Sequence, residues 1–216
     1  MPNSQNLSSD AIIIGGGHNG LVCAYYLATK GLKVHVYERR SIVGGAAVTE
    51  EFHPGFRNSV ASYTVSLLNP EIIKDMKLKE YGLKIVKRPI SNFLPIDNKT
   101  YLKLGGGLER TQNEFKKFAE KDAARLPEYY ERIEAVADVL RDLSIKTPPN
   151  PKQGLRAALN AALQLWPIAT KGNQVHRDVY DLFTKSARSF LDAWFENEHI
   201  KAAFGFDSIV GNFASP

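Results

Sequence analysis

A short segment near the N-terminus has the residue types and spacing of a phosphate-binding turn. GGGHNG (15–20) matches the pattern G-x-G-x-x-G, whose glycines permit a tight turn, close approach of a pyrophosphate, and close packing of a helix on a strand. Glu38 follows Gly20 by 18 residues, where a carboxylate can accept hydrogen bonds from both hydroxyls of a ribose. The glycines and the acid therefore predict a dinucleotide site, without distinguishing NAD from FAD.

The flanking segments predict a β-α-β unit that would hold these residues. AIII (11–14) is a short apolar run, typical of a strand buried on both faces, and KVHVY (33–37) has the alternation of a second strand. Between them, LVCAYYLATK (21–30) predicts a helix that ends at Gly31. The start of this helix, at Leu21, would offer unpaired amides and the positive end of its dipole to phosphates.

A second glycine turn follows the first pattern and helps to distinguish between the two candidate cofactors. ERRSIVGGAA (38–47) places Arg40 two residues after the acid, and a glycine pair six and seven residues after it. This arrangement resembles the signature E-x-R-x-x-x-G-G of the flavin amine oxidase and phytoene desaturase superfamily. Residues 10–216 resemble a phytoene-desaturase-like group within it, most specifically over 15–66. The resemblance implies FAD as the cofactor, with the glycine pair near the flavin and Arg40 beside the pyrophosphate.

The pattern and the resemblance together give one set of candidate cofactor-binding residues. They are Gly15, Gly17, His18, Asn19, Gly20, Glu38, Arg39, Arg40, Gly44, Gly45 and Ala46. Ala46 stands where many members of the superfamily have arginine. The catalytic residues are not assigned. The five histidines have no metal-ligand spacing, so no metal is expected. The single cysteine, Cys23, is expected to be buried and non-catalytic, because disulfide redox chemistry needs two cysteines.

The remainder of the chain predicts a small antiparallel sheet followed by helices. Thr111 and Glu114 have the spacing of a capping box, and Asp122 is expected to cap the next helix, with Pro127 in about its first turn. The expected strands are 83–89, 91–97 and 100–104, and the expected helices are 111–121, the segment from Asp122 onwards, 155–169 and about 175–197, with a connector at 147–153.

The predicted fold class is therefore α/β. A Rossmann-like βαβ FAD-binding unit spans residues 1–82, and a partial substrate domain spans 83–216, with short strands at 83–104 and helices at 111–197. Within the second part, LRAALNAALQLWPIA (155–169) is apolar on nearly all sides. It is either a buried helix or one that lies on a membrane surface, and burial is preferred because the helix has no basic polar face.

Composition excludes several classes of protein. The chain is 44% hydrophobic and 24% charged, which is typical of a globular protein, and no apolar run approaches the ~20 residues of a membrane-spanning helix. Residues 74–88 carry six basic and two acidic groups within a net charge of +5. No stacking aromatics alternate with these lysines, so the segment is interpreted as a solvated face and no nucleic acid partner is expected. The first nine residues carry no Lys, no Arg and no apolar core, so no targeting signal is seen.

The resemblance implies an FAD-dependent oxidoreductase that takes a hydride from a small organic substrate. Apolar polyenes and other lipid-like molecules are the candidates, and peripheral membrane contact is compatible with them. The cytoplasm of a bacterium or the mitochondrial matrix of a eukaryote is the implied compartment, and the oligomeric state is not predicted. Members of the superfamily are more than twice as long and complete the FAD domain with a Gly-Asp motif that this chain lacks beyond residue 60. The chain is therefore expected to be an N-terminal fragment that exposes apolar surface along 155–169 and 175–195 and has no turnover alone.

Two alternatives remain open from the sequence. One is a truncated, non-catalytic nucleotide-binding or interaction module. The other is an NAD-binding Rossmann dehydrogenase, against which the second glycine turn argues.

Overall fold

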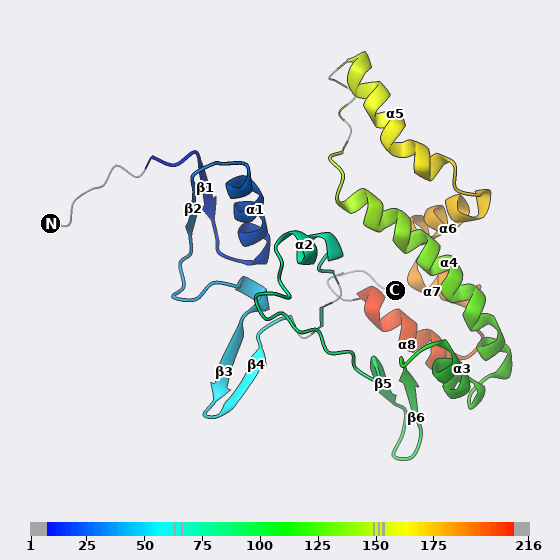
Figure 1. Cartoon of the computed structure of the whole chain (residues 1–216). Helices are drawn as coiled ribbons and strands as arrows, with labels where there is room; N and C mark the ends of the chain where they lie inside the picture. Colours follow the sequence, from blue (N-terminus) through cyan, green and yellow to red (C-terminus); the bar gives the residue numbers. More distant parts are fainter. Residues whose placement is uncertain are drawn as a thin grey trace. The chain divides into compact units, whose positions relative to one another are not determined.

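The computed structural model describes residues 8–62, 64–65, 67–148, 150, 152 and 154–209 (Figure 1). The chain divides into two compact units, Met1–Lys87 and Arg88–Pro216. The first unit contains parallel strands and the second is mostly helical, so the predicted mixed α/β class is confirmed.

The first unit begins with the predicted β-α-β arrangement. Strands β1 (Ala11–Ile14) and β2 (Val34–Tyr37) pair in parallel, and helix α1 (His18–Thr29) connects them and packs on their surface. Helix α1 begins three residues earlier than predicted, because Gly17 is its N-cap.

The prediction that β1 is buried on both faces is wrong. The side chains of Ile12 and Ile14 are 60% and 82% exposed. Within the described residues the sheet has two strands, and α1 packs against both of them, so alternate residues of β1 remain in solvent.

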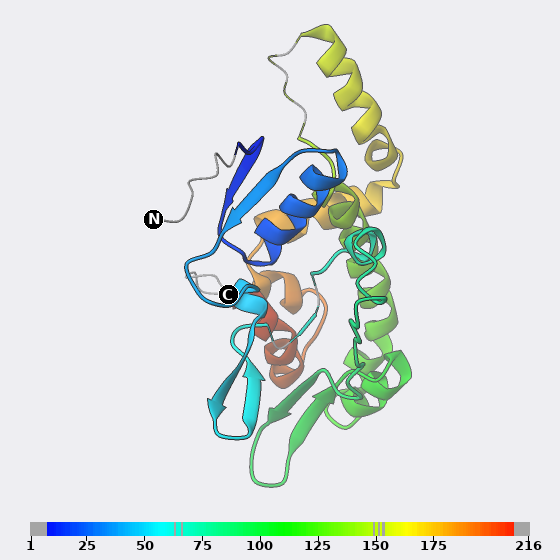
Figure 2. The same ribbon diagram turned by 60° about the vertical axis from the view of Figure 1, so that its left-hand side comes forward.

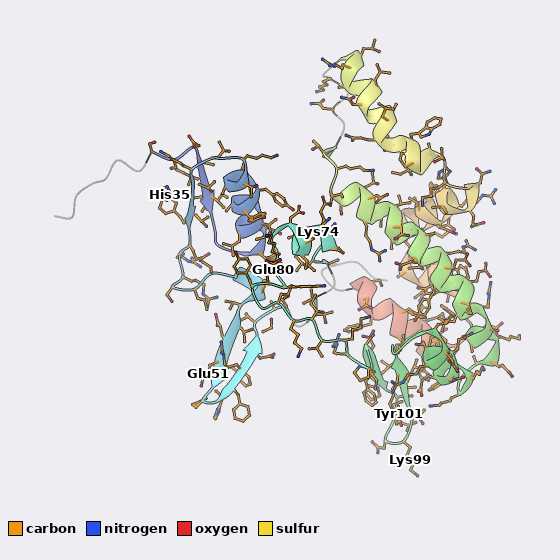
Figure 3. All side chains as sticks on the ribbon, in the orientation of Figure 1. His35, Glu51, Lys74, Glu80, Lys99 and Tyr101 are labelled. Carbon is orange, nitrogen blue, oxygen red and sulfur yellow. The ribbon has the colours of Figure 1, made fainter. Side chains whose placement is uncertain are left out.

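The rest of the first unit contains elements that the sequence did not predict. A short 3₁₀ turn, η1 (Gly45–Ala47), precedes an antiparallel hairpin of β3 (Thr49–His53) and β4 (Phe56–Ser59). Figure 3 labels Glu51 on β3. Helix α2 (Pro70–Asp75) follows, and the side chain of its N-cap Asn69 accepts a hydrogen bond from the Glu71 amide (2.9 Å).

The second unit begins with a two-stranded hairpin rather than the predicted three-stranded meander. Strands β5 (Asn92–Pro95) and β6 (Tyr101–Leu104) pair in antiparallel fashion. Asp97 holds the turn by accepting hydrogen bonds from the amides of Lys99 (2.7 Å) and Thr100 (2.8 Å), and Figure 3 shows Lys99 at this end of the hairpin. Residues 83–89 form no strand, so that prediction is wrong.

Six helices are described in this unit (Figure 1). They are α3 (Leu108–Lys116), α4 (Glu120–Ser144), α5 (Leu155–Ala169), α6 (Asn173–Thr184), α7 (Ala187–Asp192) and α8 (Glu198–Ile209). The predicted helix at 155–169 is confirmed within these bounds. The connector predicted at 147–153 lies partly outside the described residues.

The predicted capping box is wrong. Helix α3 begins at Leu108, so Thr111 lies inside it, and the Thr111 hydroxyl donates to the Gly107 carbonyl (3.0 Å). Asp122 does not cap α4, whose N-cap is Ala119. Its carboxylate instead accepts hydrogen bonds from two amides that precede α8, as described below. Pro127 lies inside α4, beyond the first turn.

The single helix predicted over about 175–197 is interrupted after Thr184 and ends at Asp192. The Ser186 hydroxyl accepts a hydrogen bond from the Ser189 amide (3.1 Å), which starts α7 after α6 has ended at Thr184. The Asn197 side chain accepts from the His199 amide (3.0 Å) and starts α8, which was not predicted. Ser and Asn caps are local signals that the apolar spacing of this segment concealed.

The core of the second unit lies where β6 meets the helices. Tyr129 of α4 is at its centre, with its ring centroid 4.9 Å from that of Phe204 and 5.0 Å from that of Phe195. The buried core residues are Leu102, Leu104, Phe115, Ala123, Leu126, Tyr129, Leu191, Trp194, Phe195, Ile200 and Ala203. Asp122 ties α4 to this core, because its two carboxylate oxygens accept the amides of Glu196 and Asn197, each at 2.9 Å.

Helix α5 takes no part in this core. Figures 1 and 2 show it extending away from the other helices of its unit, and no residue of α5 is buried. The preferred prediction that 155–169 is a buried helix is therefore wrong, whereas the expected apolar exposure along this segment is present. Among the described residues no helix combines the length and the apolar character needed to cross a membrane.

Candidate nucleotide-binding site

The turn between β1 and α1 is built by glycines, and at Gly15 and Gly20 the backbone leaves no unstrained place for a side chain. Gly15 has a φ of +104°, a conformation that glycine adopts freely, and its amide extends the parallel pairing by donating to the Tyr37 carbonyl (2.7 Å). A Cβ on Gly20 would lie 2.2 Å from the Gly15 carbonyl oxygen. Gly20 therefore allows α1 to begin directly against the end of β1.

The first turn of α1 presents unpaired backbone amides. The N-cap is Gly17, with no side-chain cap, and the Leu21 amide is the first to find a carbonyl of the turn, that of Gly17 (2.9 Å). His18 and Asn19 are exposed, and the first turn contains no acidic residue. Free N–H groups at the positive end of a helix dipole are suited to a phosphate.

Glu38 directly follows β2 and faces this turn. One carboxylate oxygen, Oε2, accepts the Gly16 amide (2.7 Å), and the other, Oε1, accepts the Arg40 amide (2.9 Å). The backbone N–H of Arg40, then that of Gly16, favours the ionised form and lowers the pKa of Glu38 below its ordinary value. Glu38 is therefore ionised at neutral pH and holds the glycine turn in place.

The second glycine turn lies against the first. Gly44 pairs in parallel with Gly17, and the Gly44 amide donates to the Gly16 carbonyl (2.7 Å). A Cβ on Gly45 would lie 2.9 Å from the Cα of Gly17. The two segments that the sequence singled out, 15–20 and 44–45, therefore form one continuous backbone surface, with Ala46 exposed next to it in η1.

The two arginines of the predicted set directly follow Glu38. The Arg40 guanidinium forms an ion pair with Glu50 of β3, and both side chains are partly exposed. Arg39 is exposed. Arg40 is thus held beside the β3–β4 hairpin by a partner that lies ten residues away and has no signal in the sequence.

Gly16 is a residue of the site that the predicted set omitted. It is buried, its amide binds Glu38, and a Cβ there would lie 3.0 Å from Val43 Cγ1. The signal was present, since Gly16 is the middle residue of three consecutive glycines, but the G-x-G-x-x-G pattern assigns no role to that position.

Cys23 is exposed on α1, so the prediction that it is buried is wrong. It lies on the outward side of the helix, flanked by half-buried Val22 and Ala24. Among the described residues there is no group of three or more His, Cys, Asp or Glu side chains that could hold a metal ion.

Comparison with known proteins agrees with this geometry. Residues 13–76 match the family model described as an NAD(P)-binding Rossmann-like domain. This part of the chain has a Rossmann-like fold. The Rossmann-like domain includes both glycine turns and Glu38, and extends through the β3–β4 hairpin into α2.

Named relatives extend the similarity beyond the Rossmann-like domain. Pyridine nucleotide-disulfide oxidoreductase domain-containing protein 2 of Rattus norvegicus is 38% identical over 221 residues, which cover 96% of this chain and 38% of the rat protein. A limonene dehydrogenase component of Castellaniella defragrans is 37% identical over 136 residues, which cover 62% of this chain and 25% of that protein. The 4,4'-diapolycopen-4-al dehydrogenase of Metabacillus indicus is 27% identical over 204 residues, covering 91% of this chain and 38% of that protein.

These relatives, one named as an oxidoreductase and two as dehydrogenases, confirm the resemblance to an oxidoreductase family that the segment 15–66 indicates. The chain spans about two fifths of the length of the curated relatives that match it along nearly its whole length.

Proposed function

We propose that this chain is the cofactor-binding part of an FAD-dependent, phytoene-dehydrogenase-like oxidoreductase that removes a hydride from an apolar organic substrate. The observation that carries the proposal is the contact between the two glycine turns. Gly17 and Gly44 pair through their backbones, and a side chain on Gly45 would collide with Gly17. A nucleotide bound at the first turn could therefore extend along the second without meeting a side chain.

The residues present fit such a dinucleotide. The glycines at 15–20 and the amides at the start of α1 are suited to the pyrophosphate, because they leave backbone N–H groups accessible. Glu38, ionised and held at the end of β2, retains lone pairs that could accept ribose hydroxyls. When bound, FAD would supply the ring that accepts the hydride, and the protein would supply position and the exclusion of water.

The names of two relatives support an apolar organic substrate. One is part of a limonene dehydrogenase and the other is a 4,4'-diapolycopen-4-al dehydrogenase. The rat relative is named for disulfide chemistry, but this chain has a single cysteine, so a redox pair of cysteines cannot form within it.

NAD(P) is the second candidate cofactor. The matched family model is described as NAD(P)-binding, and the glycine turn with Glu38 would suit the adenosine half of either dinucleotide. The second glycine turn favours FAD, because it continues the open backbone surface beyond the part that adenosine and pyrophosphate would occupy.

The cofactor can be identified directly. Protein purified without an affinity tag would be denatured, and the released nucleotide separated by chromatography and identified by absorbance and mass. The stripped protein would then be titrated with FAD, NADH and ADP-ribose. Release of FAD, and FAD affinity exceeding that of ADP-ribose, would support the proposal. NADH binding without flavin binding would favour the dehydrogenase alternative, and binding of ADP-ribose as tight as that of FAD would show that the flavin half has no site here.

A further inference from the structure

Helix α5 directs its largest apolar side chains into solvent. Leu155, Leu159, Leu163 and Trp166 are 80%, 58%, 72% and 66% exposed. They are separated by four, four and three residues, so they lie on one face of the helix. This set is called the α5 outer face below.

The opposite side of α5 is less exposed but less apolar. Its half-buried residues are Ala157, Ala161, Gln164 and Ile168. The first three border a shallow hollow between α5 and the residues that precede it, Thr147, Pro148 and Asn150. A helix packed on a protein core has the reverse arrangement, with its leucines inward, so α5 exposes the face that a helix normally buries.

The charges around α5 indicate the kind of surface. Residues 143–177 contain no Asp or Glu and five cations: Lys146, Lys152, Arg156, Lys171 and Arg177. Arg156 lies on α5 itself, and the other four lie in the segments that flank it. Arg156 is exposed in the first turn of α5, and Lys171 is exposed two residues beyond its end. The net charge of these 35 residues is +5, against +4 for the shorter lysine-rich segment 74–88, and no carboxylate interrupts it.

We propose that α5 lies in the interface of a membrane that contains anionic lipid, with its outer face in the acyl region. Interfacial helices bury an apolar face ~5–10 Å into the headgroup–acyl boundary and place cations among anionic headgroups. Trp166 has the amphipathic ring that is enriched at this depth. The fifteen residues of α5 rest on the membrane rather than cross it.

A second copy of this chain is a poorer occupant of the same face. Two α5 helices packed on each other would bring both sets of five cations together, and the segment 143–177 offers no carboxylate to pair with them. Anionic headgroups supply the negative charge that would neutralise these cations. A lipid surface therefore suits both the apolar outer face and the cations on either side of it.

Flotation of the full 216-residue chain with lipid vesicles tests this proposal. The vesicles would be phosphatidylcholine alone, or phosphatidylcholine with about one third phosphatidylglycerol, at low and at high salt. We expect flotation with the anionic vesicles, weakened by salt. Leu159→Gln with Leu163→Gln should lower the partition coefficient about tenfold or more, because two exposed leucines lose their burial in lipid. Both side chains are exposed and outside the core, so the variant should fold, as checked by circular dichroism.

Fluorescence gives a second, local readout. Trp166 is exposed and Trp194 is 6% exposed in the core, so a blue shift on vesicle binding should come from Trp166 and vanish in Trp166→Phe. Lys152→Glu with Arg156→Glu should abolish flotation, whereas the matched control, Lys84→Glu with Lys87→Glu in the other basic segment, should float as the wild type does.

Three results would overturn the proposal. The first is that the leucine double variant floats as well as the wild type. The second is that flotation is lost with the Lys84 and Lys87 substitutions and with no others. The third is that the protein floats with none of the vesicles. A dimer in light scattering that the leucine substitutions dissociate, without vesicle binding, would assign the outer face to a second copy instead.

Discussion

The carboxylate of Glu38 accepts a hydrogen bond from the backbone N–H of Gly16, 2.7 Å away, and a second from the amide of Arg40. A residue at the end of β2 thus holds the turn at the end of β1. The acid that the sequence assigns to ribose recognition is also part of the scaffold that shapes the phosphate turn. A substitution of Glu38 should therefore change both the nucleotide affinity and the stability of the turn.

Glu38→Gln should weaken FAD binding by about tenfold or more, since charge-assisted hydrogen bonds to the ribose and to the turn are lost together. Isothermal titration of the stripped protein measures this. Glu80→Gln is the matched control, because Glu80 is an exposed glutamate of the same unit that belongs to neither glycine turn (Figure 3). Equal FAD affinities of the wild type and Glu38→Gln would show that Glu38 does not bind the cofactor.

The pH dependence of stability should reveal the same hydrogen bonds. The amides of Arg40 and Gly16 lower the pKa of Glu38 in the folded protein from its ordinary value of 4.5. The stabilisation by this carboxylate is therefore complete above pH 4.5 and is lost as the pH falls through the lowered pKa. Urea unfolding at several pH values should show a steeper loss below pH 4.5 in the wild type than in Glu38→Gln. Parallel pH profiles would contradict the assignment.

How far the sequence predicted this protein depended on whether a signal was local. The glycine spacing, the apolar run of β1 and the position of Glu38 predicted the β-α-β unit correctly, because each depends on neighbours within one turn or one strand. The β3–β4 hairpin was missed, because its strand TEEFH is mostly polar and exposed and shows no periodicity. No spacing rule links Arg40 to Glu50, whose contact exists only after the hairpin has folded.

The helical unit shows the same distinction. Asp122 has the residue type of an N-cap, but it serves amides 74 and 75 residues away, at Glu196 and Asn197, which a local rule cannot detect. The apolar composition of α5 was recognised, but its preferred burial was wrong. Composition gives no information on which neighbour, if any, covers an apolar helix.

Gly20→Ala should destabilise the protein by about 1–3 kcal/mol, as overpacking of a closely packed site does. The reason is that the new Cβ would lie 2.2 Å from the Gly15 carbonyl oxygen and would push α1 away from β1. Denaturant unfolding measures the loss. Gly205→Ala, inside α8 where the new Cβ would lie an ordinary 3.7 Å from Leu191 Cδ1, provides the control and should not destabilise the protein. If Gly20→Ala has the same free energy of unfolding as the wild type, α1 does not begin against this turn.

Asp178→Ala should destabilise the helical unit by about 1.5–3 kcal/mol. Asp178 is buried and accepts hydrogen bonds from Arg132, whose guanidinium lies 4.7 Å from the ring centroid of Trp194. Its removal leaves the arginine beside the core with a longer contact, 3.5 Å, to the exposed Glu128. Glu134→Ala removes an exposed ion pair with Arg141 and should cost less than about 1 kcal/mol. Equal losses of unfolding free energy in the two variants would show that the burial of Asp178 does not strengthen its interaction with Arg132.

Cys23 should react quickly with a thiol reagent in the folded protein, because its side chain is exposed on α1. Labelling with Ellman's reagent in buffer and in urea measures this, and the two rates should be similar. Cys23→Ser should bind FAD as the wild type does. A thiol that reacts only after unfolding would restore the buried position that the sequence predicted.

The most direct test of a dinucleotide site at the joined glycine turns is FAD titration of Gly17→Ala. The Cβ of this variant would lie 3.8 Å from the Cα of Gly45, an ordinary contact, and Gly17 has a φ of −74° that alanine adopts, so the fold should be kept. The new methyl group would occupy the surface that a pyrophosphate must approach. We predict that the variant stays folded, with a melting temperature only slightly lowered because alanine is a poorer N-cap than glycine. Its FAD binding should be at least about tenfold weaker, the loss of one charge-assisted contact or more. Wild-type affinity for FAD in a folded Gly17→Ala protein would contradict the account.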